Sequence, residues 1–504
     1  MILEDWKKLQ NGSDIRGVAH AGVAGENVNL TPEVAEILGK SFAIWLRRKG
    51  FENPRAAIGM DSRITGPDLK RAFSNGLTSL GANVVDCSLA STPAMFMACI
   101  DEVLQVDGAV MLTASHLPFN RNGMKFFTDR GGFDKQDISD LLEIAAGGSF
   151  PGSGQPGMVK KTDFISVYAG ILVDKIREGV NDPERYEQPL VGLKIIVDAG
   201  NGAGGFFAHK VLVPLGANIE GSQFLEPNGH FPNHVPNPED KEAMESISTA
   251  VKRTGADLGI IFDTDVDRAA IVDASGKAIS RNELIALISA VILEEHPGSV
   301  IVTDSITSKG LKWFIEAELG GIHQRFKRGY KNVINESKRL NEVGSGSWLA
   351  IETSGHAALK ENYFLDDGAY LVAKLLIKMA RLKKENRSLA SLIEKMPAPT
   401  GSQEFRLPLT SEDFYEYGEK IISFLGEMAL KEQGWTLEEP NYEGIRILCS
   451  NPIENGWFLL RLSLHDPLMP LNIESDVEGG VKAIASRLVR LLRGFKHLDT
   501  SSLI

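Results

Sequence analysis

A serine and a histidine directly follow a short apolar segment. Residues 108–112 are small or apolar, and Thr113, Ala114, Ser115 and His116 come next. In α/β proteins the carboxyl ends of strands open into the site crevice, so a serine there can act as a nucleophile. Turns favour serine in general, so this segment alone also fits an ordinary strand-end turn.

A second apolar run, residues 258–262, ends in three aspartates at alternate positions, Asp263, Asp265 and Asp267. An extended backbone points alternate side chains to one side, so we expect these carboxylates to converge on one cation. Oxygen ligands favour Mg²⁺ over zinc or copper. Without a metal the three acids would repel one another. Haloacid dehalogenase phosphatases also place Asp-x-Asp after an apolar strand, and this alternative stays open, although the third aspartate and Arg268 depart from their pattern.

The order of strand, helix and second strand occurs three times. In each copy the first apolar run meets an aspartate: Asp61, Asp198 and Asp304. The second strand leads to a polar tip in each copy: Ser115, Asp263 and Glu352. Self-similarity at roughly hundred-residue spacing indicates repeated domains, since solenoid repeats have periods of about 20 to 50 residues. We therefore predict an α/β protein in which three related domains line one shared cleft.

A glycine-rich segment, residues 200–205, matches the G-x-G-x-x-G pattern of dinucleotide-binding loops, with Glu220 downstream. The equivalent loops at Asp61 and Asp304 lack these glycines. Because the loop position repeats while the glycines do not, we interpret the segment as a tight turn between strand and helix, and we keep dinucleotide binding as a lesser alternative.

Composition and charge narrow the class of protein. The length of 504 residues is typical of three to four domains. A formal net charge of −12 argues against nucleic acid or an anionic membrane as a bulk partner. The longest apolar stretch, within residues 284–293, is far shorter than the roughly 20 residues of a membrane span. Three scattered cysteines, Cys87, Cys99 and Cys449, favour a reducing compartment over a disulfide framework or a zinc site.

Domain boundaries are indicated by composition. Residues 147–157 form a connector rich in Gly, Pro and Ser, residues 272–276 form a hairpin turn, and residues 396–401 form a linker after an amphipathic helix at about 367–385. Short β-like runs and a final helix at 481–492 predict a smaller α+β domain at the end. The expected domains cover residues 1–152, 153–276, 277–396 and 397–504.

Together these motifs resemble the α-D-phosphohexomutases, the phosphoglucomutase/phosphomannomutase superfamily. The resemblance rests on the serine loop at 113–116 with Asn122-Gly-x-Lys125, the acidic loop at 263–268, the loop at 352–356, the N-terminal signature at 14–17 and the phosphate loop at 461–467. It spans the chain in the right order. It implies a four-domain architecture with three related α/β domains and a distinct C-terminal α+β domain.

The resemblance also implies a reaction: a mutase interconverts hexose 1-phosphate and hexose 6-phosphate, with glucose or mannose as the sugar, through a phosphoserine and a hexose bisphosphate, which also serves as activator. One Mg²⁺ per chain would be held by Ser115, Asp263, Asp265 and Asp267. The catalytic set would be Ser115, His116, Lys125, Arg268 and His356, with Lys125 and His356 as candidates for proton transfer. Substrate would be bound by Arg16, Glu352, Ser354, Arg461 and Ser463.

Several positions depart from the family pattern. The unusual residues are Leu117, Val266, Ile351 and the segment 464–466, which stands where the phosphate loop usually has Gly-Thr-Glu. The altered phosphate loop keeps open a catalytically impaired sugar-phosphate-binding protein, although retention of Ser115 and the aspartates favours an enzyme. Within the enzymes, residues 122–127 lean toward phosphoglucosamine mutase as the alternative to a glucose or mannose enzyme.

The expected partner is a small sugar phosphate, with no nucleic acid and no membrane, and the expected state is a monomer or homodimer. The first residues lack the basic-then-apolar order of a signal peptide, so a cytoplasmic location is expected. A plastid location stays open if a transit peptide precedes this sequence.

Overall fold

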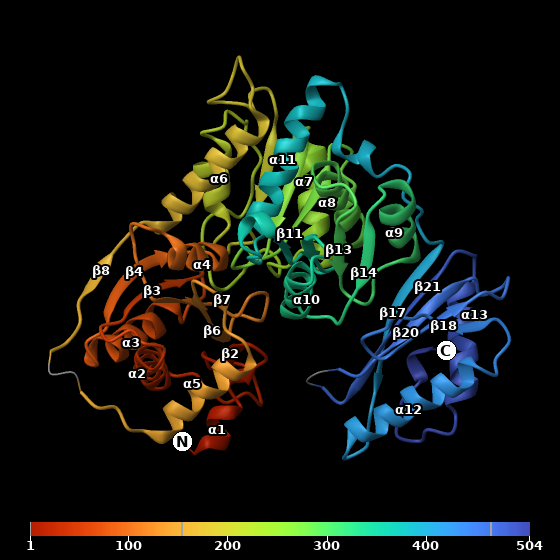
Figure 1. The fold of residues 1–504 in the computed structure, drawn as a ribbon, viewed down its shortest axis with the longest axis horizontal. Helices are drawn as coiled ribbons and strands as arrows, with labels where there is room; N and C mark the ends of the chain where they lie inside the picture. Colours follow the sequence, from red (N-terminus) through yellow and green to blue (C-terminus); the bar gives the residue numbers. More distant parts are fainter. Residues whose placement is uncertain (1, 153–154, 464–465, 504) are drawn as a thin grey trace. The chain divides into compact units, whose positions relative to one another are not determined.

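The structure is a computed structural model that describes residues 2–152, 155–463 and 466–503. The chain divides into two compact units. The first unit comprises Met1–Leu284 with Ser354–Ser391, and the second comprises Ile285–Thr353 with Leu392–Ile504. Both units contain β-sheets with helices packed against them, as expected of α/β architecture (Figure 1). Within the described ranges, no helix combines the length and the apolarity needed to cross a bilayer.

The first unit begins with an eight-stranded sheet that carries the serine loop. Its order is β1-β2-β6-β5-β3-β4-β8, with β7 paired to β6. The strands are β1 (Gln10–Asn11), β2 (Asp14–Val18), β3 (Arg55–Met60), β4 (Asn83–Leu89), β5 (Gly108–Leu112), β6 (Arg121–Thr128), β7 (Gly131–Gly132) and β8 (Val159–Lys161). Strand β5 is buried along its whole length and lies between parallel β3 and antiparallel β6. It ends three residues before Ser115.

Helices cover both faces of this sheet (Figure 1). The bounds are α1 (Leu3–Lys7), α2 (Pro32–Arg48), α3 (Gly66–Ser79), α4 (Thr92–Ile100) and α5 (Lys135–Gly147). Apolar side chains of α2, α3 and α5 share one core with the strands, whereas α4 packs on the opposite face. The Ser91 hydroxyl accepts the amide of Ala94 and so fixes the start of α4, with Pro93 in its first turn.

A second sheet in the first unit carries the acidic loop and has the order β12-β11-β10-β9. Its strands are β9 (Ile195–Asp198), β10 (Leu258–Phe262), β11 (Ala269–Asp273) and β12 (Ala278–Ile279). The surrounding elements are α6 (Phe164–Val180), the π-helix η1 (Phe207–Leu212), α7 (Lys241–Thr254), β16 (Ala357–Leu359) and α11 (Gly368–Lys384). The predicted hairpin turn is confirmed, since the Asp273 amide donates to the Lys277 carbonyl at 2.9 Å.

The second unit holds two further sheets. Strands β13 (Val300–Thr303), β14 (Ile322–Arg325) and β15 (Ser347–Ile351) are parallel, with β13 in the middle. An antiparallel sheet of order β17-β21-β20-β19-β18 follows. Its strands are β17 (Gly401–Pro408), β18 (Trp435–Leu437), β19 (Ile445–Cys449), β20 (Gly456–Leu460) and β21 (Leu468–Ser475). The main helices are α8 (Arg281–Glu295), α9 (Lys309–Trp313), α10 (Tyr330–Glu342), α12 (Phe414–Ala429) and α13 (Gly480–Leu492). These sheets confirm the predicted fold class.

The three strand-end aspartates are buried, and each pairs with a different basic side chain. The ion pairs are Asp61 with Arg63 at 3.3 Å, Asp198 with His234 at 3.0 Å, and Asp304 with Arg328 at 3.6 Å. A buried carboxylate is stable only when it is paired and hydrogen-bonded. The repeat therefore preserves the position of the acid, while each copy supplies its own counter-charge.

Candidate active site

Ser115 lies in a tight turn beyond β5, with its residue only 5% exposed. Its φ of +49° is in the left-handed region, which is unfavourable for a residue with a Cβ. The Ser115 amide donates to Thr113 Oγ1 at 2.9 Å, and the Ser115 hydroxyl donates to Asp263 Oδ2 at 2.9 Å. The strained turn therefore directs the hydroxyl at the acidic loop.

Arg63 holds the backbone of the serine loop. Its guanidinium donates to the carbonyl oxygens of Ser115, Leu117, Pro118 and Arg121 at 2.5, 2.6, 2.7 and 2.9 Å. Asp61 balances the charge of this buried arginine. Sequence reasoning noted Asp61 but missed Arg63. The arginine two residues after a strand-end aspartate was the available signal.

The three aspartates converge as predicted, but the predicted extended backbone is wrong. Asp263, Asp265 and Asp267 are completely buried, and one oxygen from each lies within 4.8 Å of the others. The residues after β10 form a turn, in which buried Val266 has a φ of +70°. The left-handed residue bends the chain around a common point, so curvature rather than strand alternation brings the carboxylates together.

The carboxylate oxygens of this cluster fit a metal ion. Asp265 Oδ1 and Asp267 Oδ1 are buried and have no hydrogen-bond partner within the described part of the chain. Unpaired buried oxygens are unfavourable, and hard oxygen ligands suit Mg²⁺. Burial, followed by the charges of Asp267 and Asp265, raises the pKa of Asp263 well above its usual range. A divalent cation bound there would counter this effect and favour the ionised form of Asp263.

Two further side chains bind the acidic loop directly. Lys125 Nζ, from β6, donates to Asp265 Oδ2 at 3.1 Å and also to Asp267. Thr92 Oγ1, in the first turn of α4, donates to Asp265 Oδ2 at 2.5 Å. Burial alone would raise the pKa of Asp267, but Lys125 and His356 outweigh it and lower that pKa. Thr92 was missed because a lone threonine gives no sequence signal.

Arg268 connects the serine to its neighbouring histidine. Its Nη2 lies 3.1 Å from Ser115 Oγ and 2.7 Å from His116 Nδ1. Burial, Arg268 and Arg16 lower the pKa of His116 to about 3. The ring is therefore neutral at physiological pH, and its Nδ1 accepts a hydrogen bond from Arg268. Arg16 lies nearby, since its Nη1 donates to the Thr113 carbonyl at 2.8 Å.

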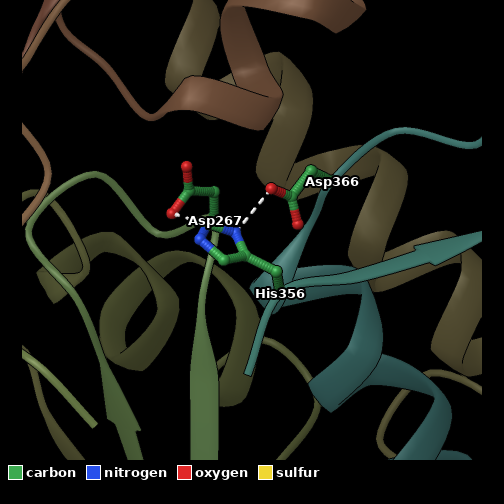
Figure 2. A group of neighbouring side chains, drawn as sticks. All are labelled: Asp267, His356 and Asp366. Carbon is green, nitrogen blue, oxygen red and sulfur yellow. Dashed lines mark hydrogen bonds and ion pairs between the residues drawn. The ribbon is translucent and has the colours of Figure 1, made fainter. Parts of the chain in front are cut away.

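His356 lies between two carboxylates (Figure 2). Its Nδ1 is 2.6 Å from Asp366 Oδ2 and 3.8 Å from Asp267 Oδ1. Burial would lower the pKa of His356, but Asp366 and Asp267 outweigh burial and raise it. A carboxylate on Nδ1 fixes the ring orientation and stabilises the protonated ring. Asp366 was missed, although the acid pair at 366–367 before an amphipathic helix was visible in the sequence.

The loop at 352–356, which is expected to bind the sugar, is divided between the two units. Glu352 belongs to the second unit, where its Oε1 accepts the Gly329 amide at 2.7 Å. Ser354 and His356 belong to the first unit. Ser354 Oγ is buried and has no hydrogen-bond partner among the described residues. A buried hydroxyl without a partner is suited to binding a polar ligand.

The predicted phosphate-binding residues at the end of β20 also lie in the second unit. Arg461 is 9% exposed, its Nε has no partner among the residues described, and its Nη1 lies 3.9 Å from Glu443. The Ser463 amide donates to the Leu468 carbonyl at 3.0 Å. Leu464 and His465, on which the altered loop depends, lie outside the described residues.

The structure gathers most of the predicted site residues within the first unit. These are Arg16, Ser115, His116, Lys125, Asp263, Asp265, Asp267, Arg268, Ser354 and His356. The others, Glu352, Arg461 and Ser463, belong to the second unit.

Known proteins resemble this chain over almost its whole length. The α/β/α domains I, II and III of phosphoglucomutase/phosphomannomutase match residues 7–148, 173–276 and 280–399. A phosphomannomutase/phosphoglucomutase of Pseudomonas putida is 30% identical over 480 residues, which cover 94% of this chain and 92% of that protein. A phosphoglucomutase of Neisseria gonorrhoeae is 28% identical over 486 residues, 96% of each chain.

A solved structure agrees with this result. The crystal structure of a phosphoglucomutase/phosphomannomutase family protein from Burkholderia thailandensis superposes with a TM-score of 0.78, at 27% identity and over 98% of both chains. The fold and the order of the domains therefore follow one known architecture. The chain belongs to the phosphoglucomutase/phosphomannomutase family of the α-D-phosphohexomutase superfamily.

Proposed function

We propose that this protein is a hexose-phosphate mutase that interconverts the 1-phosphate and 6-phosphate of glucose or mannose. The observation that carries the proposal is the contact between the Ser115 hydroxyl and Asp263. This contact lies within a buried cluster of carboxylates in which two oxygens have no hydrogen-bond partner among the described residues. The choice of sugars is supported by the names of the relatives from Pseudomonas putida and Neisseria gonorrhoeae.

The acid cluster and Ser115 are proposed to hold one Mg²⁺, which when bound neutralises phosphoryl charge. Ser115 Oγ carries the phosphoryl group. The bond between phosphorus and Oγ breaks as phosphorus bonds to a sugar hydroxyl oxygen. The proton of that hydroxyl passes to His356, and the leaving Oγ takes a proton from Lys125, which the carboxylates of the acidic loop keep as an ammonium. Arg268, 3.1 Å from Oγ, stabilises the charge in transit. The hexose bisphosphate reorients and returns its other phosphate to Ser115, so a bisphosphate also activates unphosphorylated enzyme.

Substrate binding is assigned to polar side chains that can bond to hydroxyls and to arginines that can bond to phosphate. Glu352 and Ser354 bind sugar hydroxyls, and Arg16, Arg461 and Ser463 bind the phosphate that is not reacting. The forked guanidinium suits a phosphate because it can donate two parallel hydrogen bonds. His116, with its lowered pKa, acts as a neutral hydrogen-bond partner of Arg268 rather than as an acid.

A coupled assay tests the proposal. Glucose 1-phosphate, mannose 1-phosphate and glucosamine phosphate are supplied separately, with a hexose bisphosphate and Mg²⁺. We expect the highest kcat/KM for glucose or mannose 1-phosphate. The highest value for glucosamine phosphate would establish the alternative phosphoglucosamine mutase, and binding without turnover of any sugar would establish the impaired sugar-phosphate binder.

Replacing Arg461 with alanine is expected to raise KM. A charge-assisted hydrogen bond contributes about 1.5 to 3 kcal/mol, so the increase should be at least about tenfold. The control is Arg406→Ala in β17, whose side chain is 73% exposed. Steady-state kinetics measure both variants. An unchanged KM in Arg461→Ala would show that this arginine does not contact the phosphate.

Replacing Asp366 with asparagine is expected to lower kcat at least about tenfold with little change in KM, because an amide no longer stabilises the protonated His356 ring. The substitution keeps the side-chain size. Glu385→Gln, at the exposed end of α11, removes the same charge without contacting the site and serves as control. Equal kcat values for both variants would contradict a role of Asp366 in positioning His356.

A further inference from the structure

A cavity of about 490 Å³ lies in the first unit. None of its described lining residues belongs to the candidate active site. Its apolar lining includes Leu89, Ala90, Phe206 and Leu225. This volume lies in the range of roughly 300 to 1,000 Å³ that is typical of small-molecule sites, which are mostly apolar with a few polar groups. The cavity can therefore hold the apolar body of a small molecule.

The polar groups of the cavity favour an anion. Lys161 at the end of β8 and Lys210 in η1 line it, together with one carboxylate, Asp163. Lys210 Nζ lies 3.4 Å from Asp163 and is partly neutralised by it. Because two lysines face a single carboxylate, the net charge of these three groups is positive.

The strand β4 is distorted where it forms the cavity wall. The pairing of β3 with β4 shifts between Ile58 and Gly59, which leaves Cys87 outside the ladder. Ser88, the next residue, has a φ of +58°. Its amide donates to Asp86 Oδ1 at 2.8 Å, which stabilises the bend. Bulges and left-handed residues of this kind gather at functional sites because they redirect side chains.

One residue of the cavity wall bonds to the acidic loop, and a second lies two residues from such a bond. The amide of Ala203 donates to the Thr264 carbonyl at 2.8 Å. Ala90 lies two residues before Thr92, whose amide donates to the Asp265 carbonyl at 2.8 Å. A molecule that moves either wall would therefore displace the backbone that carries the carboxylates.

We propose that this cavity is an effector site for a small organic anion with an apolar body, such as an aromatic carboxylate or sulfonate. An anion bound in the cavity changes the affinity of the acid cluster for Mg²⁺. By thermodynamic linkage, bound Mg²⁺ changes the affinity of the cavity for the anion by the same factor. Binding of the anion is independent of the proposed mutase function, whereas the effect on Mg²⁺ rests on the proposed metal site.

The binding test uses the full chain and 1-anilinonaphthalene-8-sulfonate as fluorescent probe. We expect one saturable site per chain. The neutral analogue N-phenyl-1-naphthylamine, which lacks the sulfonate, should bind more weakly by a factor of about 3 to 5, as expected for loss of a partly exposed charge interaction. Equal affinity of the two probes would overturn the assignment of an anion.

Matched variants locate the site. Ile165→Trp fills the cavity from α6 and should abolish saturable binding. Val167→Trp, on the same helix but 43% exposed and outside the lining, should retain it. Lys161→Gln should weaken binding about threefold, and the adjacent Lys160→Gln should not.

Absence of saturable binding in the unmodified chain, or unaltered binding by Ile165→Trp, would overturn the site. If circular dichroism shows Ile165→Trp to be unfolded, equal affinities of the two lysine variants would overturn it.

The coupling is measured by calorimetric Mg²⁺ titration with and without the sulfonate. A change in Mg²⁺ affinity of at least about threefold is expected, which is a modest allosteric coupling. Identical Mg²⁺ affinities would overturn the effector role. Failure of Mg²⁺ to bind in either condition would contradict the proposed metal site, and saturable binding of the sulfonate would still support the cavity.

Discussion

Replacing Ser115 with alanine is expected to lower kcat for hexose-phosphate interconversion by at least about 10⁴-fold, because loss of a nucleophile removes the covalent step entirely. The hydroxyl is the group that contacts both Asp263 and Arg268. Intact-protein mass spectrometry should show a fraction of the unmodified chain with one phosphate, and this fraction should be absent from Ser115→Ala. The coupled assay measures the loss of turnover on the same samples.

The control for this experiment is Ser79→Ala. Ser79 is an exposed serine at the end of α3, so its removal should leave both phosphorylation and turnover unchanged. Circular dichroism should show that both variants retain the fold. A fully active Ser115→Ala, or a phosphate mapped to another residue, would remove Ser115 from the proposed mechanism.

Replacing Asp265 with asparagine is expected to weaken Mg²⁺ binding at least about tenfold, because changes even to groups around metal ligands cost 10- to 100-fold in affinity. The same substitution removes one of three buried carboxylates that repel one another, so the metal-free variant should melt no lower than the metal-free unmodified chain. Calorimetric titration and thermal unfolding with and without Mg²⁺ measure these two effects. Turnover should fall with metal affinity.

Two comparisons complete the metal experiment. Glu245→Gln on α7 removes one negative charge from a side chain that is 65% exposed, and should leave Mg²⁺ binding unchanged. A chelator should abolish turnover of the unmodified chain, and added Mg²⁺ should restore it. If neither the chelator nor the Asp265→Asn substitution changes the rate of turnover, the proposed metal site is ruled out.

The strands and their polar tips could be predicted because the signals are local. Residues 108–112 and 258–262 form β5 and β10 without a shift of boundary, since an uninterrupted apolar run can be buried on both faces. The helix expected at about 367–385 is α11, for which the Asp367 side chain caps the first turn by accepting the Tyr370 amide. Apolar periodicity and a capping residue were sufficient here.

The contacts that complete the site could not be predicted, because they join distant segments. Arg63 and Ser115 are 52 residues apart, and Thr92 and Asp265 are 173 residues apart. The extended conformation predicted for the acidic loop was wrong for a different reason. A buried, β-branched Val266 at positive φ contradicts local preference, so only the surrounding packing can impose that conformation.

The four carbonyl oxygens bound by Arg63 have a consequence for the catalytic cycle. Carbonyl oxygens do not titrate, and the guanidinium keeps its charge in proteins. The backbone around Ser115 is therefore held by groups whose charge is the same whether or not the serine is esterified. A loop held in this way needs no rearrangement between donating a phosphoryl group and receiving one. In the proposed mechanism the large motion in each turnover then falls to the sugar bisphosphate, and the same serine loop serves both directions of the reaction.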